Sequence, residues 1–244
     1  MTDIIGKTFD LPNNTSVTLV SVMPDPGVHT YADGQTITTA EARVLWAARQ
    51  STRSTSDTSS ALTTYAQDKR LFTRLWRDKH STPFEFVQVQ LHVVCSLATR
   101  SQWHRHRSAS YNEYSRRYSE EWTHVQRPQW RGQSTHNKQV GDGALSDELR
   151  AKWDAKFDAF WTQAAALYEE ALADGIAREV ARDFLPASTL TRFAVSVNLR
   201  NLMGFLALRC APDAQKEIFD LACIIRDEML PQISPWMSEL WGDK

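Results

Sequence analysis

The sequence contains few of the features that mark fibrous, disordered or membrane-spanning proteins. Its 244 residues are 42% hydrophobic and include only nine glycines and nine prolines, which excludes a collagenous or low-complexity chain. No apolar run approaches the roughly 18 residues that a transmembrane helix needs. The first ten residues contain Asp3 and Lys7 and lack an apolar core, so we expect no secretory signal. We therefore expect a globular protein that does not bind membranes.

Cysteine is also scarce, and its placement argues against disulfides and against a metal centre. Cys95, Cys210 and Cys223 are odd in number, lie far apart and form no C-x-x-C pair. Cys95 and Cys223 lie in apolar runs that are typical of a protein core. His104 and His106 have no nearby Asp, Glu or Cys that completes a metal site. The sequence thus predicts a reduced, cytoplasmic protein without a metal.

The common nucleotide-binding loops are missing as well. The chain contains no G-x-G-x-x-G sequence and no P-loop, which excludes a Rossmann or Walker type of nucleotide site. Ser115 has no G-x-S-x-G context, so an acyl-transfer triad is not expected. If the protein binds a dinucleotide, arginines and loops have to hold its phosphates.

Net charge is close to zero, but the charge is unevenly distributed. The 28 Lys and Arg residues nearly balance 29 Asp and Glu residues, which argues against a protein that coats nucleic acid. Between Arg100 and Arg131, however, seven arginines stand against three glutamates. The neutral average therefore conceals an arginine-rich centre.

Hydrophobic periodicity predicts a small sheet and many helices. Strands are expected over residues 15–22 and 84–94 and around 193–197, because apolar and β-branched residues alternate or cluster there. The second strand has the strongest signal, with Val87, Val89, Leu91 and Val93 on one face. Helices are expected over residues 38–50, 61–79, 96–105, 146–174, 176–185, 198–208 and 213–230.

Several helix ends have recognisable signals. Thr38-x-x-Glu41 matches a capping box at the start of the first helix, and Pro231 is expected to end the last one. The helix over residues 146–174 has one apolar stripe and is followed by Gly175. The stripe consists of Trp153, Phe157, Phe160, Trp161, Ala164, Leu167, Tyr168 and Ala171. Without a repeat or a linker, the chain is expected to form one helix-dominated α+β domain over residues 1–244, with a small, mostly antiparallel sheet.

Residues 102–118 carry the densest functional signal. They read Q-W-H-R-H-R-S-A-S-Y-N-E-Y-S-R-R-Y, with few acidic residues and no lysine. Guanidinium groups bind phosphate oxygens in pairs, and interleaved aromatic side chains can stack on flat rings. The segment therefore favours a nucleotide or flavin site over a solvated charged loop. In residues 198–209, arginine and asparagine interrupt an apolar helix, and a buried guanidinium requires an anionic or accepting partner.

Separated segments of the chain resemble the flavin-dependent thymidylate synthases. Arg105-His106-Arg107 and Ser115, with seven residues between them, match the R-H-R-x7-S signature of that family. His80–Glu85 matches the H-x-T-P-F-E segment, and Glu179–Pro186 matches E-V-A-R-x-x-L-P. Thr191–Arg209 contains the T-R-F, V-N-x-R and L-x-L-R segments. The resemblance covers residues 43–229.

The resemblance implies the activity and the partners of that family. It implies methylation of dUMP to dTMP, with 5,10-methylenetetrahydrofolate as carbon donor and NADPH as reductant through bound FAD. It also implies a homotetramer whose sites are assembled from several subunits, and it implies no nucleic-acid partner.

The resemblance further implies a set of site residues. The implied dUMP contacts are Gln102, Arg105, Glu113, Ser115, Arg117, Arg182 and Arg209. The implied FAD contacts are Ser51, His80, Arg105, His106, Arg107, Glu113, Asn198 and Arg200. Arg209 and His80 are the catalytic candidates. Arg209 is expected to stabilise the ionised N3 of the uracil, and His80 is expected beside the flavin ring and the folate.

The chain departs from the family pattern at a few positions. Phe86 stands where a histidine is common, and Gly204 stands where an asparagine often contacts FAD. Residues 51–60 and 126–143 also look altered. Two alternatives therefore stay open. One is a flavoprotein of this fold without synthase activity, and the other is a single-stranded nucleic-acid binder that uses the arginine and aromatic segment as a stacking groove.

Overall fold

A five-stranded antiparallel sheet forms the centre of the molecule. The computed structural model describes residues 4–51, 62–118, 124–135 and 141–242. The strands lie in the order β1-β2-β5-β9-β6, and every neighbouring pair is antiparallel. Their bounds are Thr8–Asp10 (β1), Ser16–Met23 (β2), Gln88–Ser96 (β5), Ser110–Glu113 (β6) and Leu190–Asn198 (β9).

Strand β5 follows from its alternating sequence, as expected. Val89, Leu91 and Val93 are buried on one face, while Gln90 between them is exposed. The expected start of the strand at residue 84 is wrong, because Thr82–Phe86 forms a 3₁₀ helix. Its second residue is a proline, whose fixed φ angle suits the first turn of a helix better than a strand.

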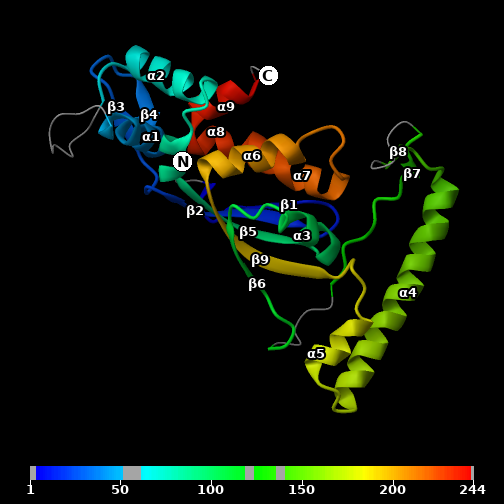
Figure 1. Cartoon of the computed structure of the whole chain (residues 1–244). Coiled ribbons are helices and arrows are strands. Elements are labelled where there is room, and N and C mark those ends of the chain that lie inside the picture. The colour runs from blue at the N-terminus through cyan, green and yellow to red at the C-terminus, as the bar shows by residue number, and fades with distance from the viewer. Residues whose placement is uncertain (1–3, 52–61, 119–123, 136–140, 243–244) are drawn as a thin grey trace.

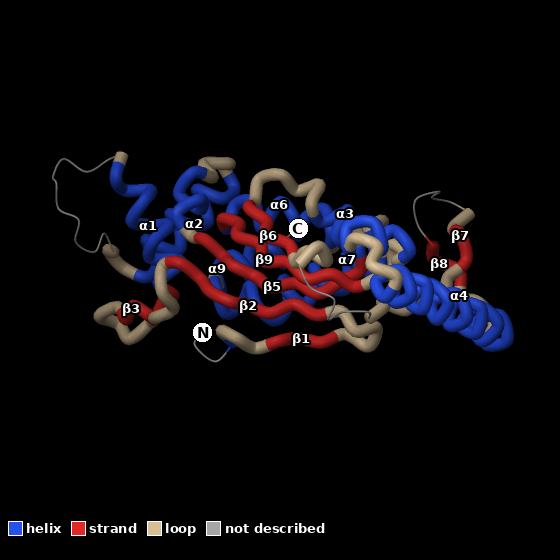
Figure 2. Tube along the Cα trace, turned by 90° about the horizontal axis from the view of Figure 1, so that it is seen from below, coloured by secondary structure: helices blue, strands red, loops and turns tan. Residues whose placement is uncertain are grey.

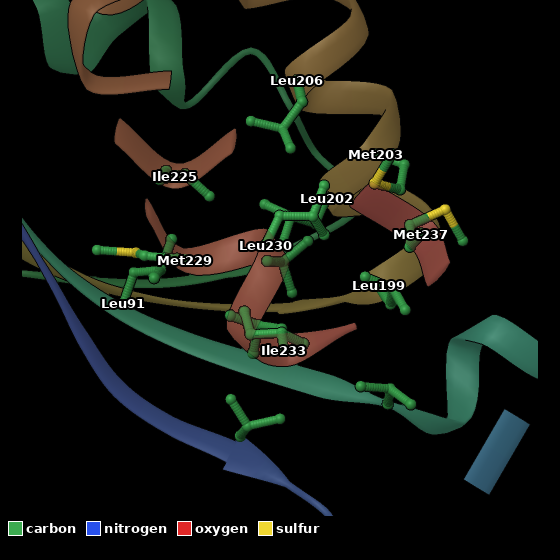
Figure 3. Packing of buried hydrophobic residues seen from close by; sticks show 14 of the residues in the cluster. Leu91, Leu199, Leu202, Met203, Leu206, Ile225, Met229, Leu230, Ile233 and Met237 are labelled. Atoms are coloured by element: carbon green, nitrogen blue, oxygen red, sulfur yellow. The ribbon is translucent and has the colours of Figure 1, made fainter. Parts of the chain in front are cut away.

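Helices cover one face of this sheet. Viewed from below in Figure 2, the strands lie in front of α6, α7 and α9. The bounds on this side are Leu199–Arg209 (α6), Lys216–Ile224 (α7), Leu230–Ile233 (α8) and Pro235–Gly242 (α9). Leu91 of β5 packs in one buried cluster with Leu202, Met229 and Leu230 (Figure 3). Burial of each such side chain stabilises the fold by roughly 1.5–3 kcal/mol.

The capping box at Thr38 is confirmed, and it also connects the first helix to the last one. Helix α1 (Thr39–Gln50) begins after Thr38, whose side chain accepts from the backbone N–H of Glu41. The carboxylate of Glu41 accepts from the backbone of Thr38 at 2.9 Å and of Trp236 at 2.8 Å. A cap that is local in sequence therefore also fixes the start of α9. Helix α2 (Tyr65–Arg77) starts four residues later than expected, and residues 52–61 before it lie outside the described ranges.

Helix α4 (Asp147–Ala173) extends away from the sheet, with the short α5 (Arg178–Ala181) beside its far end (Figure 1). The expected helix is confirmed, and Gly175 after it adopts a φ of 80°. Of the apolar stripe, Ala164, Tyr168 and Ala171 are buried. Trp153, Phe160 and Leu167, by contrast, are 43%, 52% and 39% exposed. Trp130 packs against Trp153 and Phe157, but Phe160 and Leu167 remain largely exposed in one chain.

Other differences from the expected elements lie at helix ends and in short strands. The last long helix does not stop at Pro231, because a π-helical segment (Ile225–Met229) leads into α8 and places the proline in its first turn. The expected helix over residues 176–185 is α5 followed by a 3₁₀ turn (Arg182–Phe184). The unexpected short strands besides β1 and β6 are Val28–Thr30 (β3), Thr36–Thr38 (β4), Gly132–Gln133 (β7) and Gly141–Gly143 (β8). The helix-dominated α+β class with a small antiparallel sheet is confirmed.

Candidate active site

The arginine-rich segment is a sharp connection between helix α3 (Leu97–Trp103) and strand β6. Trp103, at the end of α3, is buried against Phe193 and Phe205, with ring centroids 5.6 and 4.6 Å away. Tyr111 of β6 donates from its hydroxyl to the backbone oxygen of His106 at 2.8 Å. These contacts anchor both sides of the connection, so that His106 turns inward while its two arginine neighbours stay exposed.

His106 and Arg209 form the best-defined polar contact at this connection. Arg209, the last residue of α6, donates from Nε to Nε2 of His106 at 2.9 Å and from Nη2 to the backbone oxygen of Gln102 at 3.2 Å. Burial and the positive charge of Arg209 lower the pKa of His106 to about 4. The imidazole is therefore neutral near pH 7, and its Nε2 is an acceptor. The pair holds a permanent cation in a fixed, half-buried position.

A first cavity of about 320 Å³ lies between the sheet and α6. Its walls are mainly apolar, and His106, Arg200 and Asn201 add polar groups. Asn198 caps α6 by accepting from the backbone N–H of Asn201 at 2.9 Å, and the side chain of Asn201 donates to the backbone oxygen of Ser108 at 3.1 Å. Flat apolar walls with a few directed polar groups suit an aromatic ring system.

A second arginine of α6, Arg200, is held by an ion pair of its own. Arg200 forms an ion pair with Glu85, which lies in the 3₁₀ helix before β5. Gly204, on the same cavity wall, leaves open space, since a Cβ built there would meet no atom within 4 Å. Because glycine stands where the family often has an asparagine, the cavity wall has open space at this position.

A second cavity of about 720 Å³ lies beside the far end of β6. It brings together Glu113, Ser115, Arg117 and Arg182, although Arg182 is distant in the sequence. Four arginines and two acidic residues line this cavity, which favours an anionic ligand. Arg117 and Arg182 are exposed and can reach a ligand.

Two residues that line the second cavity, Glu113 and Arg116, are bonded to other parts of the protein. Glu113 accepts from the hydroxyl of Thr191 at 2.8 Å, and its carboxylate lies 3.1 Å from Nε of Arg100. Arg116 is buried and donates to the backbone oxygen of Leu190. No role was assigned from the sequence to Arg100, Arg116 or Thr191. The sequence feature that comes closest to indicating the two arginines is the density of arginine around the R-H-R signature.

Some expected site residues do not line either cavity in the described chain. His80 is exposed, and its backbone N–H donates to the oxygen of Leu75 at 2.9 Å. Ser51 follows α1, where its hydroxyl donates to Ala48 at 3.2 Å. Gln102, Arg105, Arg107, Asn198 and Arg209 also lie outside both linings. The altered segment at 52–60 and residues 136–140 lie outside the described ranges.

The described residues were also searched for membrane-spanning helices and for groups of metal-binding side chains. No helix in the described part of the chain is both long and apolar enough to cross a membrane. The same residues contain no group of three or more His, Cys, Asp or Glu side chains that could hold a metal ion. The polar groups that line the two cavities are guanidinium, imidazole, carboxylate, hydroxyl and amide groups.

Comparisons with known proteins agree with the resemblance. The family model described as thymidylate synthase complementing protein matches residues 35–236. The chain is 39% identical over 165 residues to the flavin-dependent thymidylate synthase of Thermus thermophilus, which covers 67% of this chain and 60% of that protein. The protein of that name from Thermosipho africanus is 35% identical over 174 residues, which cover 71% of this chain and 76% of the relative.

A eukaryotic relative shows how much of each protein is shared. The flavin-dependent thymidylate synthase of Dictyostelium discoideum is 38% identical over 159 residues, which cover 64% of this chain and 52% of that protein. The chain thus spans between half and three fifths of the length of some relatives that it matches. These matches support the synthase resemblance and not the alternative of a single-stranded nucleic-acid binder. The chain belongs to the family of thymidylate synthase complementing proteins, which includes flavin-dependent thymidylate synthases.

Proposed function

We propose that the protein is a flavin-dependent thymidylate synthase. The reaction is the reductive methylation of dUMP to dTMP, with 5,10-methylenetetrahydrofolate as carbon donor and NADPH as reductant through FAD. The observation that carries the proposal is the second cavity. Glu113, Ser115, Arg117 and Arg182, which the resemblance assigns to dUMP, line one positively charged space.

In this proposal the second cavity binds the nucleotide. Arg117 and Arg182 pair with its phosphate, because exposed guanidinium groups can turn both N–H donors to one anion. Ser115 contributes a neutral hydrogen bond and needs no activating base. Glu113 is ionisable and already accepts from Thr191 at 2.8 Å, which fixes its carboxylate at the cavity wall. The arrangement is one of binding and orientation, the main contribution of a protein to this type of reaction.

The first cavity fits part of a flavin. Its apolar walls suit the flat ring system, and Arg200 and Asn201 supply directed polar groups. Arg105 and Arg107 are exposed nearby and suit the phosphates. When bound, FAD supplies the redox chemistry of the reaction. The protein's own residues hold the ring between the sheet and α6 and exclude water from its apolar face.

Arg209 is the group that we propose to act on the pyrimidine. It is held from two sides, by Nε2 of His106 and by the backbone oxygen of Gln102. A cation in a fixed position stabilises negative charge on a nearby ring without first having to reorganise. Stabilised charge on the uracil makes its C5 a better nucleophile, so no enzyme thiol has to attack the ring. Cys95 is fully buried, and burial raises the pKa of its thiol, which agrees with a structural role.

We further propose that the active enzyme is a cytoplasmic homotetramer with shared sites. Arg105, Arg107, His80 and Ser51 are exposed in one chain and lie outside both cavity linings, so neighbouring subunits are the natural place for their ligands to be completed. The exposed apolar residues along α4 supply a surface that a subunit can cover. Light scattering on the FAD-loaded protein tests this assembly, and a monomer would contradict it.

The activity is tested with purified protein, FAD, NADPH, dUMP and 5,10-methylenetetrahydrofolate. We expect bound flavin absorbance and NADPH oxidation that rises when dUMP is added. A colourless protein without dUMP-dependent oxidation, even after added FAD, would refute the proposal. Bound flavin with no response to dUMP would instead support a flavoprotein of this fold that lacks synthase activity.

A further inference from the structure

The size of the second cavity does not by itself set the number of phosphate groups that its ligand carries. Its volume of about 720 Å³ lies well within the range of roughly 300–1,000 Å³ that holds ligands of drug size. Guanidinium groups attract phosphate, and the attraction grows with each negative charge that the ligand adds. Size and arginine content alone would therefore favour a nucleoside di- or triphosphate over a monophosphate.

The four arginines of this cavity are not equally available to a ligand. Arg116 is buried and donates to a backbone oxygen. Nε of Arg100 lies 3.1 Å from the carboxylate of Glu113, and only 28% and 24% of these two side chains are exposed. Each of these two guanidinium groups thus already has a partner within the protein. Arg117 and Arg182 are left as the exposed cations of the cavity.

The two exposed arginines keep their outer nitrogens for a ligand. Nε of Arg182 donates to the backbone oxygen of Glu179 at 3.2 Å, which orients the guanidinium group. Nε of Arg117 lies 3.5 Å from the hydroxyl oxygen of Ser115. The Nη atoms of both arginines have no hydrogen-bond partner among the described residues. Two such forks suit the oxygens of one phosphate group.

The third exposed charge of the cavity is negative. Asp183 follows Arg182 in the 3₁₀ turn and lines the same cavity. Its side chain is exposed and forms no ion pair or hydrogen bond with another residue of the described ranges. Glu113, by contrast, is held by Arg100 and Thr191. An uncompensated negative charge beside a phosphate-binding arginine opposes every further phosphate group on the ligand.

We propose that Asp183 restricts the second cavity to nucleoside monophosphates, because its charge repels the additional phosphate groups of a di- or triphosphate. The inference rests on the proposed function, since it requires that the phosphate of the nucleotide meets Arg117 and Arg182. These arginines supply an attraction that all nucleotides share, and Asp183 supplies the repulsion that distinguishes them. Asp183 is thus a specificity-determining residue that acts at the binding step.

The test compares binding of dUMP and dUDP to the FAD-loaded protein by isothermal titration calorimetry. The wild type is expected to bind dUMP at least about fivefold more tightly than dUDP, which is the effect of one pair of unit charges at contact distance in water. Asp183→Asn keeps the shape of the side chain but removes its charge. The ratio of the two dissociation constants should then fall by about fivefold, mainly because dUDP binds more tightly.

A second variant and a control separate the local charge from other effects. Asp183→Glu keeps the carboxylate at the cavity and should keep the preference for dUMP. Asp174→Asn makes the same chemical change at an exposed residue just after α4, outside both cavity linings, and it should leave the ratio unchanged. Flavin content and thermal unfolding are measured for each variant.

The outcomes distinguish the inference from the proposed function. A wild type that binds dUMP and dUDP equally well, or an unchanged ratio in Asp183→Asn, would overturn the inference and leave the proposed function standing. Weaker dUMP binding in Asp183→Asn would also overturn it, because the carboxylate would then accept from a hydroxyl of the nucleotide. The expected discrimination without formation of dTMP would support the inference and refute the proposed activity. A flavin-loaded wild type that binds neither nucleotide would overturn both.

Discussion

Replacement of His106 by phenylalanine tests how the structure holds Arg209. The imidazole accepts from Nε of Arg209 at 2.9 Å, and its ring lies edge-on to Phe205 with centroids 4.8 Å apart. Phenylalanine preserves the ring packing but has no acceptor. One donor of a half-buried guanidinium is then unsatisfied, which costs about 1–3 kcal/mol. If that energy appears in the transition state, kcat for dUMP-dependent NADPH oxidation falls about fivefold to 150-fold.

The pH dependence gives the same prediction a second readout. The pKa of His106 is lowered from 6.5 to about 4, by burial first and by Arg209 second, so the bond is intact at pH 7. The unfolded chain binds the proton more readily than the folded one. His106 therefore makes the fold less stable as the pH falls from about 6.5 toward 4. The variant His106→Phe should lose this part of the pH dependence in urea unfolding experiments.

The assay is a pH–rate profile of the FAD-loaded wild type and variant at saturating dUMP. His29→Phe, on β3 and outside both cavities, is the matched control and should keep the wild-type rate. An inflection of kcat near pH 6.5 that disappears in His106→Phe would refute the reasoning, because it requires a histidine that titrates in its ordinary range. A variant with unchanged kcat would refute the role of the bond.

Substitutions at two further positions test the scaffold and the cofactor cavity. Asp68 accepts from Tyr31, Arg49 and Thr63, and although burial raises its pKa, these bonds lower it overall. Asp68→Asn should lower the free energy of unfolding at pH 7 by about 2–4 kcal/mol. This loss should shrink as the pH falls below about 4, because the unfolded wild-type chain then takes up the Asp68 proton before the folded chain does. Equal urea midpoints for both proteins at pH 7 would contradict this. Gly204→Ala should raise the free energy of unfolding by about 0.5–1 kcal/mol. Gly204→Asn should tighten FAD binding in a fluorescence titration of the apoprotein, and weaker binding would show that the open space is needed.

The elements that could be predicted from the sequence are those with a local cause. Strand β5 has alternating apolar residues, and the cap of α1 lies within Thr38 to Glu41, so the signal for each is contained in a short stretch of sequence. Helix α4 was predicted for the same reason. Its pattern could not show that Trp153 and Phe160 stay exposed, because exposure depends on what the rest of the fold places nearby. The single domain over residues 1–244 stays a prediction.

The elements and contacts that escaped prediction depend on residues far apart in the chain. Strand β6 is four residues long and polar, and it exists because it pairs with β9. The bond between Gln102 and Gln215 spans 113 positions, and no local pattern announces it. The R-H-R signature identified the region of the site. The roles assigned to its residues, including His80 and Ser51, stay predictions, because neither of these two lines a cavity in one chain.

The central claim is the conversion of dUMP to dTMP by this chain with a bound flavin. The most direct measurement incubates the FAD-loaded protein with dUMP, NADPH and 5,10-methylenetetrahydrofolate, and quantifies the nucleotide products by mass spectrometry. We predict dTMP in an amount equal to the dUMP-dependent NADPH oxidised, with none formed when any one of the three substrates is left out. NADPH oxidation without dTMP, or dTMP formed without NADPH, would contradict the account.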